Sequence, residues 1–160
     1  MEQPFQGKHI DPRALPYWRI RGTISSAVIW LLTAAAFVLW QTLDFPLWLA
    51  VGATIFALAC SITNIALIPT IRWNTWRYII ADQQIELRYG VLIRHHLIIP
   101  MVRVQHVDTE QGPLLKRFGL STVTIATAAG RHEIPALADA VAEEVREKIS
   151  ILARVVDEDV

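Results

Sequence analysis

The chain has 160 residues, of which 53% are hydrophobic, and its mean hydropathy is +0.36. This composition is too apolar for an average soluble domain. The 15 Lys and Arg residues balance the 15 Asp and Glu residues, which excludes the basic field of a nucleic-acid-binding protein and leaves lipid or protein as the expected partners. The single cysteine, Cys60, excludes an internal disulfide and a zinc site built from several cysteines.

Residues 1–23 are predicted to form a short cytoplasmic tail. Pro4, Pro12 and Pro16 interrupt any long helix in this segment. Tyr17 and Trp18 follow, just before a long apolar stretch, where amphipathic rings favour the headgroup level of a membrane. The tail is therefore expected to end in an interfacial anchor.

Two long uncharged stretches come next. No charged side chain occurs in residues 22–43 or 45–71, and each stretch can cross a hydrocarbon layer of about 30 Å as an α-helix. A core helix of a soluble protein rarely stays uncharged for so long, and a cleavable signal peptide would lack the second stretch. Residues 24–68 are therefore predicted to form a transmembrane helical hairpin. Ionisable groups are missing from its middle, which argues against a transporter or pump.

Charges at the ends of the hairpin predict its orientation. Arginines flank both outer ends, whereas the break at Asp44 carries no Lys or Arg. Positive flanks stay on the cytoplasmic side, so both termini are predicted to be cytoplasmic.

Aromatic rings favour the headgroup level, and each cation near an anionic leaflet contributes about 1 kcal/mol. The candidate lipid-interface residues are Trp18, Arg19, Arg21, Arg72, Trp73, Trp76 and Arg77.

After Pro69 the apolar residues repeat with the period of two that is typical of β-strands. Six strands are predicted, over residues 76–80, 85–89, 91–99, 102–110, 121–126 and 131–134. In the fourth, Val104 and Val107 fall on opposite faces. Residues 114–118 are expected to form one helical turn.

A helical period begins at Asp139, which is predicted to cap the helix. Glu144 and Lys148 are expected to pair on its outer side. Its predicted apolar stripe consists of Val141, Val145, Ile149 and Leu152. Residues 156–160 form an acidic tail. The fold class is therefore predicted as α+β, with a transmembrane hairpin, an antiparallel sheet and a C-terminal helix that covers the sheet.

Several short motifs in the second half of the chain are similar to one family. They are Arg77-Tyr78 at a strand start, a turn at Gly90, Ile99-Pro100 followed by Arg103, and Gln111-Gly112-Pro113 followed by Arg117-Phe118-Gly119. With these motifs, residues 73–154 resemble the bacterial pleckstrin-homology-like domain of the membrane-anchored YdbS type, also called bPH2 and formerly a domain of unknown function.

The resemblance implies a bent antiparallel sheet or split barrel over residues 73–155, plugged by the C-terminal helix, with one strand more than the six predicted above. It implies a bacterial plasma membrane protein with two spans, often paired with a larger membrane relative that carries more copies of the domain. The resemblance brings no catalytic residues and no cofactor.

Patterns for catalysis or metal binding are weak. His95 and His96 point to opposite faces of a strand and cannot chelate one metal together. A site made from His96, His106 and Asp108 across strands is an alternative. Ser121 lacks the GxSxG elbow of a nucleophilic serine. The chain is therefore predicted to be a non-enzyme without metal or cofactor, and a membrane-bound hydrolase that uses His106 or Ser121 is kept as an alternative.

The preferred hypothesis is a scaffolding module that assembles with itself or with a larger relative, in envelope homeostasis or resistance to membrane-active agents. Strand 91–99 is apolar on both faces except around residues 94–96, and it has the character of an edge that adds to another sheet. The candidate protein-interaction residues are Arg103, Leu114, Leu115, Arg117 and Phe118.

The first alternative is a module that binds anionic lipid headgroups. Arg88, Arg94 and Lys116 add to the cations named above, but they are spread along the domain. Residues 69–160 hold eleven Lys and Arg against twelve Asp and Glu, so this part of the chain has no net basic field.

Overall fold

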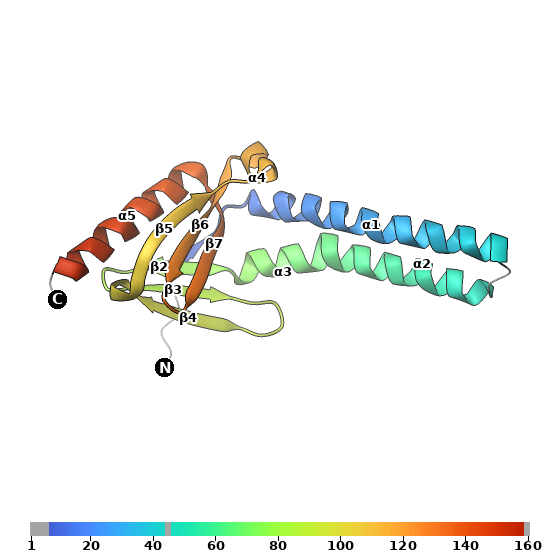
Figure 1. The fold of residues 1–160 in the computed structure, drawn as a ribbon, viewed down its shortest axis with the longest axis horizontal. Helices are drawn as coiled ribbons and strands as arrows, with labels where there is room; N and C mark the ends of the chain where they lie inside the picture. Colours follow the sequence, from blue (N-terminus) through green and yellow to red (C-terminus); the bar gives the residue numbers. More distant parts are fainter. Residues whose placement is uncertain (1–6, 44–45, 159–160) are drawn as a thin grey trace. The chain divides into compact units, whose positions relative to one another are not determined.

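The computed structural model describes residues 7–43 and 46–158 (Figure 1). The predicted break at Asp44 and the outermost ends of both predicted tails lie outside these residues. The chain forms two compact units, one made of residues 1–14 together with 72–160 and the other of residues 15–71. We call the first the sheet domain and the second the helical hairpin. Because the sheet domain is built from two separate stretches of chain, the hairpin is an insertion within it.

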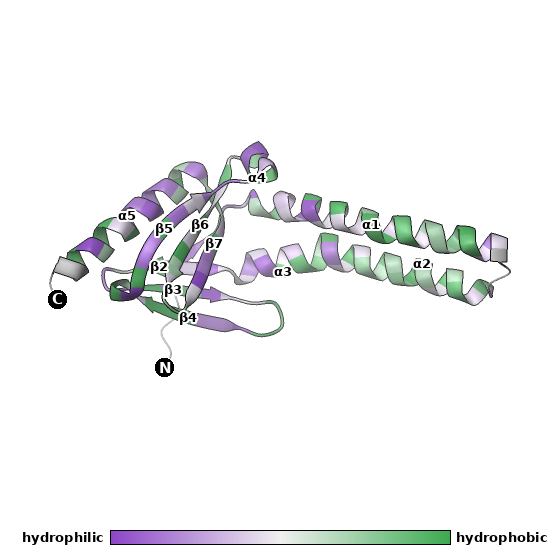
Figure 2. Cartoon of the chain, in the orientation of Figure 1, coloured by the Kyte–Doolittle hydropathy of each residue, from purple (hydrophilic) through white to green (hydrophobic). Residues whose placement is uncertain are grey.

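The helical hairpin consists of α1 (Ala14–Leu43), α2 (Leu47–Ile62) and a π-helical turn, η1 (Thr63–Leu67), which continues into α3 (Ile68–Thr75). Residues Ala14–Thr42 and Leu47–Thr75 form two helices long and apolar enough to cross a membrane. Apolar residues predominate along both of them (Figure 2). The two long apolar helices predicted over residues 24–68 are confirmed, and both extend further.

Contacts between the helices of the hairpin are close at two places. The indole Nε1 of Trp30 donates a hydrogen bond to Ser61 Oγ at 3.1 Å. Nearer the start of α1, a β-carbon on Gly22 would lie 2.4 Å from the backbone oxygen of Asn64 in η1. The missing side chain of Gly22 lets the two backbones approach closely, whereas at the other place a hydrogen bond between side chains joins the helices.

The predicted tail over residues 1–23 is wrong for its second half. Lys8–His9 form a strand, β1, and α1 begins at Ala14. Pro16 does not interrupt α1, because it lies in the first turn, where a backbone N–H has no partner within the helix. The Asp11 carboxylate accepts a hydrogen bond from the Arg13 backbone N–H at 2.8 Å, just before the helix.

The sheet domain contains two antiparallel sheets. The four-stranded sheet has the order β1-β2-β3-β4, where β2 is Arg77–Ile80, β3 is Gln84–Tyr89 and β4 is His95–Pro100. The three-stranded sheet has the order β5-β6-β7, with strands Val104–Glu110, Leu120–Thr127 and Gly130–Ala138. The described residues thus form one strand more than the six predicted from the residue pattern, because β1 was not predicted.

The short helix α4 (Pro113–Phe118) joins β5 to β6, and the long helix α5 (Asp139–Glu158) follows β7 and packs against the three-stranded sheet (Figure 1). The predicted α+β class and C-terminal helix are confirmed. Both sheets and α5 contribute fully buried side chains to one core; they include Ile85, Leu87, Ile125, Ile134 and Ile149.

Three details of α5 differ from the predictions. Val141 is partly exposed, and Ala142 is buried in its place beside Val145 and Ile149. Lys148, predicted to pair with Glu144, donates a hydrogen bond to the carbonyl oxygen of Ile80 at 3.2 Å. The Asp139 carboxylate, predicted to cap the helix, accepts hydrogen bonds from Gln111 and Ser121.

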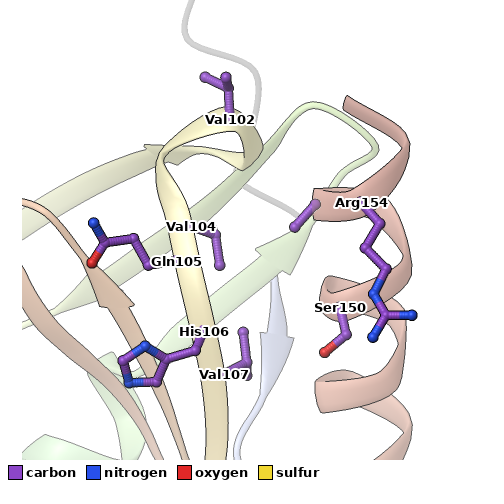
Figure 3. Close-up of a pocket in the computed structure, with 8 residues that line it drawn as sticks. Val102, Val104, Gln105, His106, Val107, Ser150 and Arg154 are labelled. Carbon is purple, nitrogen blue, oxygen red and sulfur yellow. The ribbon is translucent and has the colours of Figure 1, made fainter. Parts of the chain in front are cut away.

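Two predicted strands are shorter than expected. Residues 91–94, predicted as the start of a strand, form the turn between β3 and β4. A 3-10 turn, Met101–Arg103, precedes β5, and the register of β5 against β6 shifts between Val104 and His106. Such a bulge changes the side on which the following residues lie. Val104 and Val107, predicted on opposite faces, both point toward α5 (Figure 3).

Candidate anion-binding site

A row of basic side chains crosses the four-stranded sheet. The register places His9 opposite Arg77, Arg77 opposite Arg88 and Arg88 opposite His96. Residues directly opposite each other in antiparallel strands point to the same face of the sheet. The neighbouring residues along the strands, Tyr78 and Leu87, are buried in the core on the other face. We call His9, Arg77, Arg88 and His96 the basic row; it lies on the face directed away from the core.

An open cavity of about 450 Å³ lies beside this row. Its lining comes from the end of α3, from β2 and β3, and from the turn into β4: Asn74, Thr75, Arg77, Arg88, Tyr89, Arg94, His95 and His96. The carboxylate of Glu86 lies near one end of the row, where its Oε2 is 3.1 Å from His96 Nε2. Three arginine residues therefore line the cavity, and the Glu86 carboxylate contacts His96 and accepts a hydrogen bond from Gln84 Nε2.

The electrostatics of the row favour a bound anion. Like charges directly opposite each other destabilise a sheet, and Arg77 faces Arg88 in this way. The Arg77 side chain is half-buried, and its Nη1 is buried without a hydrogen-bond partner among the described residues. Desolvation, followed by the charge of Arg77, lowers the pKa of His9 below 6.5. An anion in the cavity would offset the repulsion and accept hydrogen bonds from the guanidinium groups.

Stacked rings hold this end of the sheet. The rings of Trp76 and Tyr89 stack with their centroids 4.9 Å apart, and the Tyr89 ring stacks on His95 at 5.2 Å. On the other side of the row, His9 stacks on Trp73 at 5.2 Å. These rings fix the strand ends that carry the basic side chains.

The predicted lipid-interface residues lie on α1 and between the end of α3 and the start of β2. Trp18 and Trp76 are only 6% exposed, so neither ring is on the surface as predicted. Arg19 and Arg21 lie exposed on α1, and Arg72 is half-buried near the end of α3. Of the predicted set, Arg77 lines the cavity. Of its partners in the row, Arg88 was named as a cation of the headgroup-binding alternative and His96 as part of an alternative metal site, whereas His9 was not predicted. Only the strand register brings the row together.

Four of the predicted protein-interaction residues lie on α4, and the fifth, Arg103, lies in the 3-10 turn before β5. Leu115 is 9% exposed and belongs to the core, so its side chain is not on the surface where a partner could contact it. Leu114 and Phe118 are half-buried. The Phe118 carbonyl oxygen accepts a hydrogen bond from Arg13 Nη1 at 3.1 Å. The two exposed members of the set are Arg103 and Arg117.

Two larger cavities also lie in the sheet domain. A groove of about 590 Å³ runs between β5 and α5, and Val104 and Val107 point into it while Gln105 and His106 point away (Figure 3). Arg154 is the cation on its helical side. Its lining is mostly apolar or neutral, so it offers less to a charged ligand than the cavity at the basic row.

The second cavity, of about 480 Å³, follows β4, which is an edge strand of its sheet. Its lining includes Ile98 and Val102, whose side chains are exposed, and Arg103. This cavity combines an open strand edge with apolar side chains.

The residues considered for catalysis are not brought together. Ser121 is buried, and its Oγ donates a hydrogen bond to Asp139 Oδ1 at 2.7 Å. His106 lies opposite Ala126, at the other end of β6 from Ser121. His96 contacts Glu86, whereas His106 Nε2 lies 3.5 Å from Asp108 Oδ2. Among the described residues, no group of three or more His, Cys, Asp or Glu side chains is arranged to hold a metal ion.

Comparison with known proteins agrees with this architecture. The sequence model of the family described as "Bacterial PH domain" matches residues 12–153. The match begins before α1, so it includes the hairpin and most of the sheet domain. The chain is also 43% identical over 159 residues to the UPF0699 transmembrane protein YdbS of Bacillus subtilis (strain 168), an alignment that covers 99% of both chains.

Proposed function

Because this chain belongs to the bacterial PH domain family, and its relative is named a transmembrane protein, we propose that it is a non-catalytic, membrane-anchored module that binds anionic lipid headgroups. In this proposal both apolar helices span a bacterial plasma membrane, and both termini are cytoplasmic. The sheet domain then lies on the cytoplasmic side, where anionic lipids attract cations.

The observation that carries the proposal is the basic row beside the open cavity. Arg77, Arg88 and Arg94 line it from three neighbouring segments, and guanidinium groups bind phosphate oxygens with two parallel hydrogen bonds. The row lies where β1 ends and β2 begins, which is where the chain passes to and from the hairpin. In this proposal, headgroup phosphates are the anions that the row binds.

The test uses the full-length protein in an uncharged detergent. Short-chain phosphatidylglycerol is titrated in, with phosphatidylcholine of the same chain length as the neutral comparison, and the thermal midpoint is measured. We expect phosphatidylglycerol to raise the midpoint of the wild type and to have little effect on Arg77→Gln or Arg88→Gln. Lys116→Gln, which removes an exposed cation from α4, should respond like the wild type. Equal responses in all four proteins would contradict the proposal.

The same titration with inorganic phosphate separates two sources of the anion. If phosphate and phosphatidylglycerol stabilise equally at the same concentration, the site recognises a soluble phosphate and the lipid is not needed. A response to phosphatidylglycerol at much lower concentration supports the lipid headgroup.

Assembly with a second copy, or with a larger membrane relative, is a second candidate function. It is favoured by the cavity along β4, because an edge strand with exposed apolar neighbours can accept a strand from a partner. Ile98→Lys should then reduce association of the purified full-length protein, whereas Thr109→Lys, at an exposed position of β5, should not. Measuring the mass of the complex in mild detergent distinguishes these results.

A further inference from the structure

The turn between β3 and β4 carries three consecutive apolar residues on the surface. Leu92 is 98% exposed and Ile93 71% exposed, and Val91 is also exposed. Three adjacent apolar side chains at the end of a hairpin form a small continuous patch, which differs from the scattered apolar residues found on any protein surface. We call Val91–Ile93 the apolar tip.

The turn that presents the tip has a defined backbone. Gly90 has φ of +136°, a conformation that favours glycine. A β-carbon at this position would lie 1.9 Å from the carbonyl oxygen of Ile93, so the chain closes too tightly for any side chain. The two residues that flank the turn, Tyr89 and His95, are paired in the sheet and their rings stack. The apolar tip is therefore held outward by its own turn.

The strand register places the tip at one particular end of the sheet. Tyr89 and His95, which flank it, lie beside the pair Arg77 and Arg88. Arg77 begins β2 directly after α3, and its partner His9 ends β1 shortly before α1. The tip thus projects from the end at which the chain passes to and from the apolar helices, whereas the exposed turn at Gln83 closes the opposite end.

We propose that the apolar tip inserts among the acyl chains of the membrane. It would then anchor the sheet domain in addition to the two apolar helices. Large apolar side chains gain free energy when a lipid surface removes them from water. Arg94 follows the tip directly and Arg88 lies nearby in the sheet, so cations stand where headgroup phosphates would be when the tip is inserted. This goes beyond the proposed function, because it concerns the hydrocarbon layer and does not require headgroup recognition.

The test places a fluorescent probe at the tip of the full-length protein. In a Cys60→Ser background, Leu92→Cys is labelled with a nitrobenzoxadiazole dye and reconstituted into phosphatidylcholine vesicles. Gln83→Cys, at the exposed turn of the opposite end, is the matched control. We expect blue-shifted emission at position 92 and strong quenching by lipids that carry a spin label on the acyl chain, with weak quenching at position 83. Equal quenching at both positions would overturn the proposal.

A second measurement removes any influence of the apolar dye. The same two cysteine variants in the same vesicles are reacted with a small, charged, membrane-impermeant maleimide. Labelling at position 92 should be several-fold slower than at position 83, and the two rates should become similar when detergent dissolves the vesicles. Similar rates in intact vesicles would contradict insertion. Because phosphatidylcholine vesicles carry no net charge, neither result depends on binding of an anionic lipid at the basic row.

Discussion

Arg77 and Arg88 lie directly opposite each other on β2 and β3, on the face of the sheet that is directed away from the core. Two like charges in this arrangement repel, and a sheet selected only for stability would place an opposite charge at one of the positions. The repulsion is concentrated beside a cavity that Arg94 also lines. An anion bound in this cavity would offset the repulsion between the two guanidinium groups.

Arg77→Gln is therefore expected to keep or raise the stability of the lipid-free protein. Relief of a like-charge pair contributes about 0.2–1 kcal/mol, although the stem of Arg77 also packs against its neighbours. Thermal unfolding in an uncharged detergent measures this change. Arg13→Gln is the contrasting variant, because Arg13 pairs with Asp11 and donates to the Phe118 carbonyl, and its midpoint should fall. A large loss in Arg77→Gln would assign Arg77 a structural role.

Headgroup binding is expected to strengthen as the pH falls below 6.5. Burial and the Arg77 charge lower the pKa of His9 in the free protein, so His9 is neutral at a pH where it would be protonated in the unfolded chain. A bound anion offsets the Arg77 charge and raises that pKa, so binding takes up a proton. Titration with phosphatidylglycerol, whose phosphate stays ionised, measures the affinity between about pH 5 and 7.5.

The variant His9→Gln shows how much of the pH dependence of lipid affinity comes from His9 and how much from the other histidines near the cavity. Its affinity should vary less with pH than that of the wild type. In the absence of lipid, the stability of the fold depends on pH in the opposite direction from the lipid affinity. Because the pKa of His9 is lowered in the folded protein, its contribution to stability is present above pH 6.5 and is lost as the pH falls. An unchanged pH profile in His9→Gln would remove His9 from the site.

Gly22→Ala is expected to weaken the helical hairpin. The added β-carbon would lie 2.4 Å from the backbone oxygen of Asn64, and a backbone atom cannot move aside as a flexible side chain would. Such overpacking costs about 1–3 kcal/mol. Gly52→Ala is the matched control, because nothing lies within 4 Å of its β-carbon and alanine favours a helix. Thermal unfolding in detergent should separate the two variants, and equal midpoints would contradict a close contact at Gly22.

Ser121→Ala is expected to lower the free energy of unfolding. The hydroxyl of the buried Ser121 donates to the carboxylate of Asp139, an exposed residue that also accepts a hydrogen bond from Gln111. Because Asp139 keeps the Gln111 bond and its contact with water, loss of the Ser121 hydrogen bond costs about 0.5–1.5 kcal/mol. Thr109→Ala, at an exposed position of β5, should change the free energy of unfolding by less than about 0.5 kcal/mol. Denaturant unfolding measures both, and a neutral Ser121→Ala would show that this hydrogen bond contributes little.

The sequence alone predicted the two long apolar helices, the central strands and the C-terminal helix. Each of these depends on a local pattern: an uncharged stretch, an alternation of apolar residues, or an apolar stripe of helical period. The prediction was wrong where position in the fold mattered. Pro16 was expected to break a helix, but it lies in the first turn of α1, where a proline is tolerated.

The tertiary structure decided where β1 pairs and which basic residues meet. The segment Lys8–His9 is too short to show a strand pattern. Its partner strand, β2, is separated from it in the sequence by the entire hairpin. Likewise Arg77, Arg88 and His96 are spread along the sequence, and only the register of three strands lines them up. Local pattern reports the period of an element, whereas the site depends on pairing between distant segments, which the sequence of one chain does not contain.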